Sequence, residues 1–573
     1  MEIEKNAEYI GVITSLGVNG EGIIKKNGYT VFIPYALPTE RVRFKVLKVK
    51  KNYAFGKIVQ VLTPADERVR PKCPVFTKCG GCQMQHVKYS YQLKYKTKAV
   101  QDCFSKIAGI DYPVAPCIKS DQDWEYRNKL QIPVVWDEKG DHVGFFAENS
   151  HRVVDIDACF IHPAWSATVI SAIKKYMEIT GVHGYNETTR QGLLRHVVVR
   201  DIDGKLLIVL VINGETLPQE EVFLSLLKEK IPDFSCYINV NTDDTNVVTG
   251  ERYRCIYGKP RYTAEEFGIT YEAGPNTFLQ VNGDVKKKIY DRAIRLAGIN
   301  ADTDVIDAYS GAGIMTAMCA KVARKAYGIE IVPEAVDCAN HLAERNGLLG
   351  KMENICGACE EVLPPLVEKI RADGHPISVI LDPPRKGAEE SVLHALLHAL
   401  PDRIVYISCN PATLARDVGI LTDTLVRADG ELKKNPNPVP KYEIVFLQPY
   451  DMFAQTKHVE TLVVLSKKIP DSHINIDVEF GEGEGQFSLK KIKECAEARK
   501  PKEKVTYKMI QEYIEKTYGF KVHTAYIAEV KRDLGLPMYD APNAVEELKR
   551  PRAHPTPKMA KAIKETLKHF EII

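Results

Sequence analysis

The chain has 573 residues, and its 78 lysines and arginines against 75 aspartates and glutamates give a formal net charge of +3. With 45% hydrophobic and 27% charged residues, its composition is that of an ordinary soluble protein. No stretch approaches the run of about 18 apolar residues that a membrane helix requires, and the length exceeds what one hydrophobic core supports, so we expect three or four domains.

The first residues, MEIEKNAEYI, carry neither the basic nor the apolar segment of a signal peptide. We therefore expect a cytoplasmic protein that does not act at a membrane. Disulfides are rare in that compartment, so the 14 cysteines are expected to be thiols, metal ligands or catalysts.

Residues 1–64 consist of short, alternating segments that are separated by Gly, Asn or Pro turns. The pattern predicts an OB-like barrel of five strands. One segment, ERVRFKVLKVKKNYAFGK, mixes basic and aromatic residues, which suits either a nucleic-acid surface or an ordinary solvated strand face. This region resembles a TRAM domain, and the resemblance implies that it binds RNA.

Residues 70–270 begin with a cysteine-rich segment and continue with a helical stretch and hairpin patterns. In LRHVVVRDIDGKLLIVLVIN, the pair Asp203-Gly204 supplies a tight turn between two strands. We predict a central α+β domain in this part of the chain.

Four cysteines of this region are candidate metal ligands. Cys73, Cys79 and Cys82 stand in a C-x5-C-x2-C spacing within CPVFTKCGGCQMQH, and DIDACFIHP supplies Cys159. The spacing differs from the paired C-x2-C knuckles that tetrahedral zinc usually takes. From the residues alone the metal stays open.

Residues 271–468 alternate between helical and strand patterns, which predicts a doubly wound, Rossmann-like α/β domain. After the Gly/Glu-rich break EFGEGEGQ, residues 475–573 are basic and have helical patterns. We expect this small helical C-terminal extension to be either an RNA-affinity module or a solvated appendage.

A cofactor site is indicated by VIDAYSGAGIMTA, a strand whose glycine turn opens a helix. Gly311 and Gly313 let the backbone approach a ligand at the helix N-terminus, and Glu330, at the end of the next predicted strand, is placed to bind two ribose hydroxyls. The third glycine of the dinucleotide fingerprint is missing. Asp307, the short G-x-G and Glu330 together resemble a class I S-adenosylmethionine methyltransferase more than an NAD enzyme.

Two further strand ends carry reactive side chains. The prolines of LDPPRKG stop a strand and hold the Asp382 carboxylate at its edge, and the strand RIVYIS ends at Cys409. Because parallel strands share one carboxyl rim, we expect both residues on that rim. Taken singly, Cys409 is better explained as a packing residue, and the acids are equally explained as helix caps or surface charges.

Several motifs together resemble the uracil-5 RNA methyltransferases, specifically the branch that acts on 23S ribosomal RNA. The resemblance covers about residues 1–468 and rests on FLQVN, DAYSGAG, GIE, LDPPRKG, SCNPATLARD and DMFAQTKHVETLVVL, in that order. In the last of these, Ala454 stands where the family commonly has proline. The site residues that the resemblance implies are a nucleophile at Cys409, a general base at Glu460, and S-adenosylmethionine contacts at Gln280, Tyr309, Glu330 and Asp382.

The chemistry of that family explains the residue types. C5 of uracil is a poor nucleophile, so thiolate addition to C6 is needed to form an enolate whose C5 accepts the methyl group. A carboxylate then removes the C5 proton. We expect the Cys409 thiol to be partly ionised at its strand terminus. The uridine must be flipped out of the RNA, and there Phe278 can stack on it and Asp382 can hydrogen-bond its edge.

In the resembling ribosomal RNA enzymes, the positions of Cys73, Cys79, Cys82 and Cys159 hold a [4Fe-4S] cluster, for which four thiolates are the normal ligands. Zinc remains the alternative. Because methyl transfer moves no net electrons, we expect the cluster to be structural or to contact RNA.

The sequence leaves the substrate open. The same chemistry on transfer RNA is the close alternative to 23S rRNA. A non-catalytic RNA-binding or assembly factor is an alternative of another class, which the presence of Cys409 and Glu460 disfavours. A cytosine-5 methyltransferase is disfavoured because SCNP lacks the Pro-Cys context of that nucleophile. The sequence indicates no obligatory protein partner.

Overall fold

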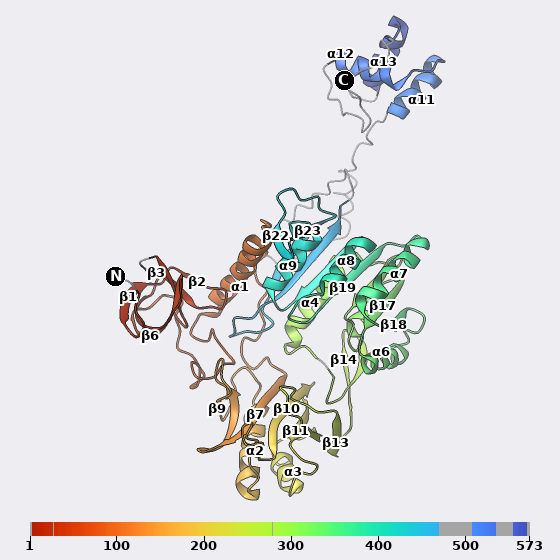
Figure 1. The fold of residues 1–573 in the computed structure, drawn as a ribbon. Helices are drawn as coiled ribbons and strands as arrows, with labels where there is room; N and C mark the ends of the chain where they lie inside the picture. The colour runs from red at the N-terminus through yellow and green to blue at the C-terminus, as the bar shows by residue number, and fades with distance from the viewer. Residues whose placement is uncertain (1–2, 27, 278, 469–506, 535–553, 570–573) are drawn as a thin grey trace. The chain divides into compact units, whose positions relative to one another are not determined.

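The computed structural model describes residues 3–26, 28–277, 279–468, 507–534 and 554–569. The chain divides into two compact units, Met1–Ser472 and His473–Ile573 (Figure 1). Within the described ranges, no helix is both long enough and apolar enough to cross a membrane.

The N-terminal strands form a closed barrel. Its strands are β1 (Glu8–Val12), β2 (Ser15–Leu16), β3 (Gly22–Lys26), β4 (Tyr29–Ile33), β5 (Arg41–Val49) and β6 (Tyr53–Thr63). They pair in the order β1-β5-β6-β4-β3-β2. Because only Ile13 and Thr14 separate β1 from β2, these are two halves of one bent strand that pairs with both ends of the sheet. This confirms the predicted OB-like barrel, whose core includes Val42, Phe44 and Val46 at alternate positions of β5.

The barrel is followed by a long helix. Helix α1 (Tyr89–Cys103) continues into a π-helical turn, Phe104–Ala108. Lys96 of α1 is fully buried, forms an ion pair with the buried carboxylate of Asp451, and donates a hydrogen bond of 3.0 Å to the carbonyl of Phe453. This contact ties α1 to the DMFAQT segment.

The central part of the chain is a seven-stranded mixed sheet covered on one face by two helices. Its strands are β7 (Lys129–Asp137), β8 (Gly140–Phe146), β9 (Val153–Asp155), β10 (Leu194–Ile202), β11 (Lys205–Ile212), β12 (Phe234–Val240) and β13 (Arg252–Tyr257), in the order β13-β12-β11-β10-β7-β8-β9. Helices α2 (Trp165–Thr180) and α3 (Glu220–Lys228) pack on it around a core of aliphatic side chains. The turn between β10 and β11 has positive φ at both Asp203 (52°) and Gly204 (82°), which confirms the predicted hairpin.

A second seven-stranded sheet carries the α/β pattern that the sequence predicts (Figure 1). Its strands are β16 (Asp304–Ala308), β17 (Lys325–Glu330), β18 (Met352–Cys356), β19 (Ile377–Leu381), β20 (Arg403–Ser408), β23 (Tyr442–Tyr450) and β24 (Glu460–Lys467). The order is β18-β17-β16-β19-β20-β24-β23, with β16 to β20 parallel and the last two antiparallel. Strand order reverses between β16 and β19, which is where open α/β sheets bind their ligands.

Helices cover both faces of this sheet. They are α4 (Gly283–Leu296), α5 (Ile314–Ala320), α6 (Pro333–Arg345), α7 (Cys359–Ala372), α8 (Glu390–Ala399) and α9 (Pro411–Leu421). Two hairpins accompany them, β14 (Tyr262–Glu266) with β15 (Ile269–Ala273) and β21 (Leu425–Ala428) with β22 (Glu431–Lys434). One of the two cores so formed also contains Val198, Val209 and Tyr237 of the central sheet, so the second face of the central sheet shares a continuous core with the α/β domain.

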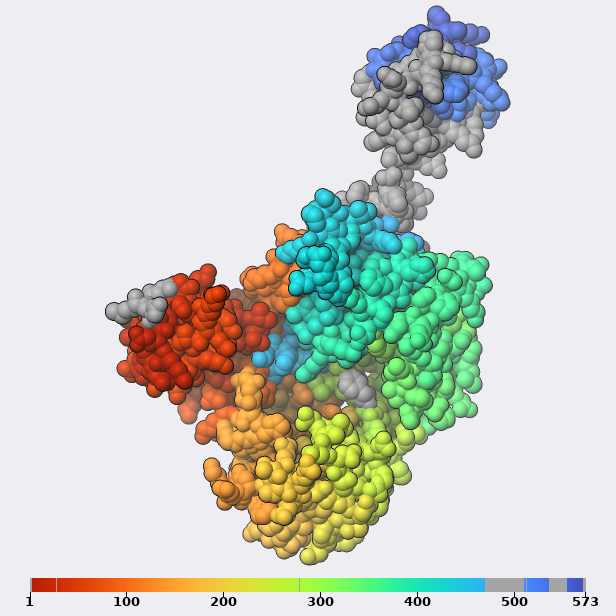
Figure 2. Space-filling model, in the orientation of Figure 1, coloured from red at the N-terminus to blue at the C-terminus, as the bar shows by residue number. Residues whose placement is uncertain are grey.

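The C-terminal unit has a core of its own. Its described helices are α11 (Tyr507–Tyr518), α12 (Thr524–Asp533) and α13 (Pro557–His569), which confirms the helical prediction for these residues. Ile510, Ile514, Ile527 and Ile563 are buried against one another. In the space-filling view the described helices of this unit are drawn in blue (Figure 2).

Candidate active site

The carboxyl ends of the parallel strands bring the predicted residues to one rim. Glu330 is the last residue of β17, Asp382 directly follows β19, and Cys409 directly follows β20. Strand β24 runs antiparallel to β20, and Ser408 pairs with Thr461, so Glu460 at the start of β24 lies beside Cys409. Residues far apart in the sequence thus lie along one rim of the sheet, on both sides of the point where the strand order reverses.

The glycine loop after β16 has the backbone geometry that its sequence predicts. Gly311 and Gly313 have φ values of 53° and 84°, a region that favours glycine. A Cβ atom on Gly313 would lie 2.7 Å from Cβ of Ala339 and 2.8 Å from Cε of Met352. The loop therefore requires glycine at 313 both for its conformation and for its packing against α6 and β18.

Glu330 is held by backbone amides at the edge of this loop. Its Oε2 accepts a hydrogen bond of 3.0 Å from the N–H of Gly311, and its Oε1 accepts one of 2.9 Å from the N–H of Val332. Each carboxylate oxygen has a second acceptor position. The fixed carboxylate can therefore still accept hydrogen bonds from a pair of hydroxyl groups.

Three carboxyl groups are buried together on the rim. Burial raises the pKa of Asp307 to about 6, although the hydroxyl of Thr316 donates to it over 2.6 Å. Burial and the charge of Asp307 raise the pKa of Asp382 to about 7. Burial and the charge of Asp382 hold the pKa of Glu460 well above its usual range. Because burial and like charges disfavour the ionised form, the three carboxyl groups are not all ionised together unless a cation lies nearby.

Gln280 and Tyr309 border the same rim. The side chain of Gln280 hydrogen-bonds the phenol of Tyr290, whose pKa is raised by burial and by Asp382 and Asp307, and the Gln280 carbonyl accepts a 3.0 Å hydrogen bond from Asn128. Tyr309 has a positive φ of 77° and its N–H donates to the carbonyl of Ile329 over 3.0 Å. Phe278 lies outside the described residues.

Cys409 sits at a turn that its neighbours fix. Asn410 caps α9, since its side chain accepts a 3.1 Å hydrogen bond from the N–H of Ala412, and Pro411 is the first residue of that helix. The thiol is half-buried. Burial and the charge of Glu460 raise its pKa to about 11, while Arg385 acts in the opposite direction. The expected partial ionisation is therefore wrong, because burial and the nearby carboxylates raise the pKa of the thiol by more than Arg385 lowers it.

Arg385 was missed as a candidate in the sequence. Its guanidinium hydrogen-bonds Cys409 and lowers the pKa of both Cys409 and Glu460. The signal was present, because Arg385 lies within LDPPRKG. The motif alone does not show that Arg385 contacts Cys409, which follows the next strand.

The four candidate metal ligands line one cavity. Cys73, Cys79, Cys82 and Cys159 surround a volume of about 200 Å³. All four are free thiols whose pKa values are raised by burial, and the charges of the other cysteines raise the pKa of Cys159 further. Arg385 also lines this cavity, which therefore adjoins Cys409.

The predicted iron–sulfur cluster is not shown by the structure and stays a prediction. Among the described residues, no group of three or more His, Cys, Asp or Glu side chains is placed to hold a single metal ion. What the geometry establishes is that thiols from two distant segments of the sequence share one cavity.

The sequence comparisons identify the family. The family model described as tRNA (uracil-5-)-methyltransferase matches residues 88–468, and the TRAM domain model matches residues 12–59. The chain belongs to the tRNA (uracil-5-)-methyltransferase family. The family match ends at residue 468, so the C-terminal unit lies outside it.

This chain matches individual family members over nearly their whole length. An uncharacterized RNA methyltransferase of Halalkalibacterium halodurans is 39% identical over 472 residues, which are 81% of this chain and 98% of the relative. One from Clostridium tetani is 36% identical over 81% of this chain and 97% of its own length. The crystal structure of Pyrococcus abyssi tRNA (uracil-54, C5)-methyltransferase in complex with S-adenosyl-L-homocysteine superposes with a TM-score of 0.61 and 26% identity, covering 80% of this chain and 99% of that one.

Proposed function

We propose that this family member methylates C5 of a uridine in 23S ribosomal RNA, with S-adenosylmethionine as methyl donor, Cys409 as nucleophile and Glu460 as general base. The observation that carries the proposal is the pairing of β20 with β24, which sets a thiol and a carboxyl group side by side on the ligand-binding rim. A thiol and a carboxyl group are the two functions that addition to C6 and proton removal from C5 require.

The residues on the rim fit S-adenosylmethionine. The glycine loop accepts a close ligand, Glu330 presents fixed acceptors for the ribose hydroxyls, and Gln280 and Tyr309 flank the same space. The buried Asp382 offers negative charge to a cationic group. When bound, the cofactor supplies a methyl group made electrophilic by its positively charged sulfur. The Pyrococcus relative, whose structure contains S-adenosyl-L-homocysteine, supports the same cofactor here.

Cys409 must lose its proton before it can attack. The thiolate is disfavoured by burial and by Glu460, and it is favoured by Arg385, whose guanidinium hydrogen-bonds the thiol. Arg385 is therefore suited to hold the thiolate during its addition to C6. We infer that binding of a cation and of the base shifts this balance toward the thiolate.

Glu460 is suited to accept a proton. Its buried carboxylate has a pKa well above the usual range, and a raised pKa makes a carboxylate a stronger base. After the methyl group has reached C5, Glu460, which must be ionised at this step, takes the C5 proton, and Cys409 leaves C6 as a thiolate. Asp382 is close enough to raise the pKa of Glu460 electrostatically, so its charge strengthens this base.

The cysteine cavity fits a [4Fe-4S] cluster by the chemistry of its donors, because four free thiols are the normal ligand set. We propose Cys73, Cys79, Cys82 and Cys159 as its ligands. Anaerobically purified protein should then contain about four iron and four sulfide per chain. Cys79→Ala should lose them and Cys103→Ala, a buried cysteine outside this cavity, should keep them. One zinc without sulfide would instead establish the zinc alternative.

The RNA class is decided by mapping 5-methyluridine in ribosomal and transfer RNA by mass spectrometry, in cells with and without the protein. Loss at one position of 23S rRNA supports the proposal. Transfer RNA is the second candidate, which the family description and the Pyrococcus enzyme favour, and loss confined to tRNA would establish it.

The nucleophile is tested by complementing those cells with variants. Cys409→Ala should restore no 5-methyluridine, whereas Cys356→Ala, an exposed cysteine, should restore all of it. Full methylation by Cys409→Ala would refute the thiolate mechanism. A non-catalytic RNA-binding factor would give no change in 5-methyluridine in any of these cells.

A further inference from the structure

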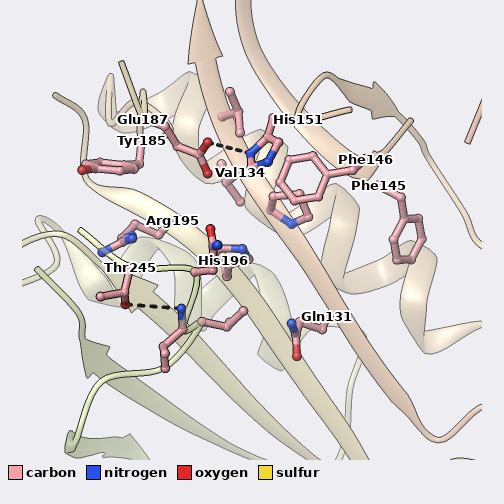
Figure 3. A pocket seen from close by; sticks show the side chains of 15 residues that line it. Gln131, Val134, Phe145, Phe146, His151, Tyr185, Glu187, Arg195, His196 and Thr245 are labelled. Atoms are coloured by element: carbon pink, nitrogen blue, oxygen red, sulfur yellow. Dashed lines mark hydrogen bonds and ion pairs between the residues drawn. The ribbon is translucent and has the colours of Figure 1, made fainter. Parts of the chain in front are cut away.

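A cavity of about 350 Å³ opens in the central sheet, outside the catalytic rim. Its lining comes from β7, β8 and β10, from the loops after β8 and before β10, and from residues 245–248 after β12. Figure 3 shows Gln131, Phe146, Tyr185 and His196 around it. The volume lies within the range of about 300–1,000 Å³ that small-molecule and cofactor sites occupy.

The charged residues of this lining already make polar contacts within the protein. Arg195 donates hydrogen bonds of 2.7 and 2.8 Å to the backbone carbonyls of Asn241 and Asp243 and one of 3.1 Å to the side-chain oxygen of Asn241, and its guanidinium lies 4.7 Å from the ring centre of Tyr185. His151 and Glu187 bind each other over 2.9 Å (Figure 3). The neutral acceptors of Arg195 leave its positive charge in the lining, which is compatible with a nucleotide and its phosphate.

The remaining lining suits a flat, polar-edged ligand. The ring of Phe146 forms part of the wall, 5.5 Å from the ring of His151 and tilted by 45°. Gln131 adds an amide with both donors and an acceptor. The Nδ1 atom of His196 is enclosed and has no hydrogen-bond partner among the described residues, so the protein does not fix its orientation through that atom. Aromatic surface together with amide and imidazole groups is the set that stacks on a nucleobase and reads its edge.

The pocket is connected to the catalytic centre by shared walls. Phe145 lines both this pocket and the cysteine cavity, and Arg385 lines that cavity and contacts Cys409. His196 also lies on the same face of β10 as Val198, because their positions differ by two. Val198 is buried in the core that the central sheet shares with the α/β domain, so the pocket lies on the face of the central sheet that faces this core.

From these contacts we infer that the pocket binds an unpaired nucleobase of the substrate RNA, from a nucleotide near the target uridine. Phe146 stacks on the base, and Gln131 and His196 hydrogen-bond its edge. A base splayed into this pocket holds the strand while the uridine reaches Cys409. This inference rests on the proposed function only in taking RNA as the substrate.

The first test is ultraviolet crosslinking of the full-length protein to total RNA from cells that lack it, followed by mass spectrometry of the peptide–nucleotide adducts. We expect an adduct on a peptide that contains Phe146, and its loss in Phe146→Leu. Adducts restricted to other parts of the protein, with none on the lining, would overturn the inference. This readout requires no methyl transfer, so an adduct without any 5-methyluridine would refute the proposed function and leave the pocket standing.

The second test separates binding from chemistry. Stacking of one base on an aromatic ring corresponds to about a 5- to 150-fold effect on binding. Phe146→Leu should therefore raise KM for RNA within that range, and His196→Ala should raise it by the loss of a hydrogen bond, with kcat unchanged in both. Phe234→Leu, a change in the buried core of the same sheet, is the matched control for lost packing. If the KM of Phe146→Leu equals that of the control, the pocket binds no base.

Discussion

The ionisation of Cys409 gives the sharpest test of the proposed mechanism. In the ligand-free site its thiol pKa is raised to about 11, against about 8.5 for a free cysteine. Each pKa unit is a factor of ten in the thiolate fraction, so at neutral pH the thiolate is about a hundredfold or more scarcer than in a free cysteine. Glu460 is the largest cause of the rise after burial. Glu460→Gln should therefore lower the pKa of Cys409 and increase the thiolate fraction at any pH below it.

The rate of iodoacetamide alkylation at Cys409, followed by mass spectrometry from pH 7 to 11, measures this thiolate fraction because only the thiolate reacts. The wild-type rate should keep rising up to about pH 11, and the Glu460→Gln rate should level off earlier. S-adenosylmethionine, a cation, should shift the wild-type profile to lower pH, whereas the uncharged sulfur of S-adenosylhomocysteine should not. A profile that levels off near pH 8.5 in both proteins, without a cofactor effect, would refute the reasoning.

Three further substitutions test other contacts. Glu330→Gln should weaken S-adenosylmethionine binding about 10- to 100-fold in calorimetry, because hydrogen bonds to a charged acceptor are lost, while the exposed Glu368→Gln should bind normally. Gly313→Ala should lower both the melting temperature and cofactor affinity, since a methyl group there overlaps α6; unchanged values would contradict the loop geometry. Lys96→Met should destabilise the first unit by about 3–5 kcal/mol in chemical denaturation, because it leaves the buried Asp451 carboxylate unpaired. A loss below about 1 kcal/mol would show that this carboxylate is not buried as a charge.

Local sequence determined those features that depend on neighbours along the chain. Alternating apolar residues in β5 specify a strand with one buried face, and Asp203-Gly204 specifies a hairpin because both residues tolerate a positive φ. The glycines at 311 and 313 predict the loop, and Asn410 with Pro411 predicts the start of α9. These patterns were sufficient to predict the barrel, the α/β sheet and the strand ends that carry Asp382 and Cys409.

Tertiary structure decided which groups meet and how their charges interact. The sequence did not show that β24 inserts antiparallel beside β20, and only that register brings Glu460 to Cys409. It predicted a partly ionised thiol, whereas the folded site buries this thiol beside Glu460 and Asp382, which raises its pKa. The contact of Arg385 with Cys409 also depends on the tertiary structure. Strand pairing and burial depend on residues that are distant in the chain, so a local pattern can specify a side chain's position on its own strand but not the electric field it meets there.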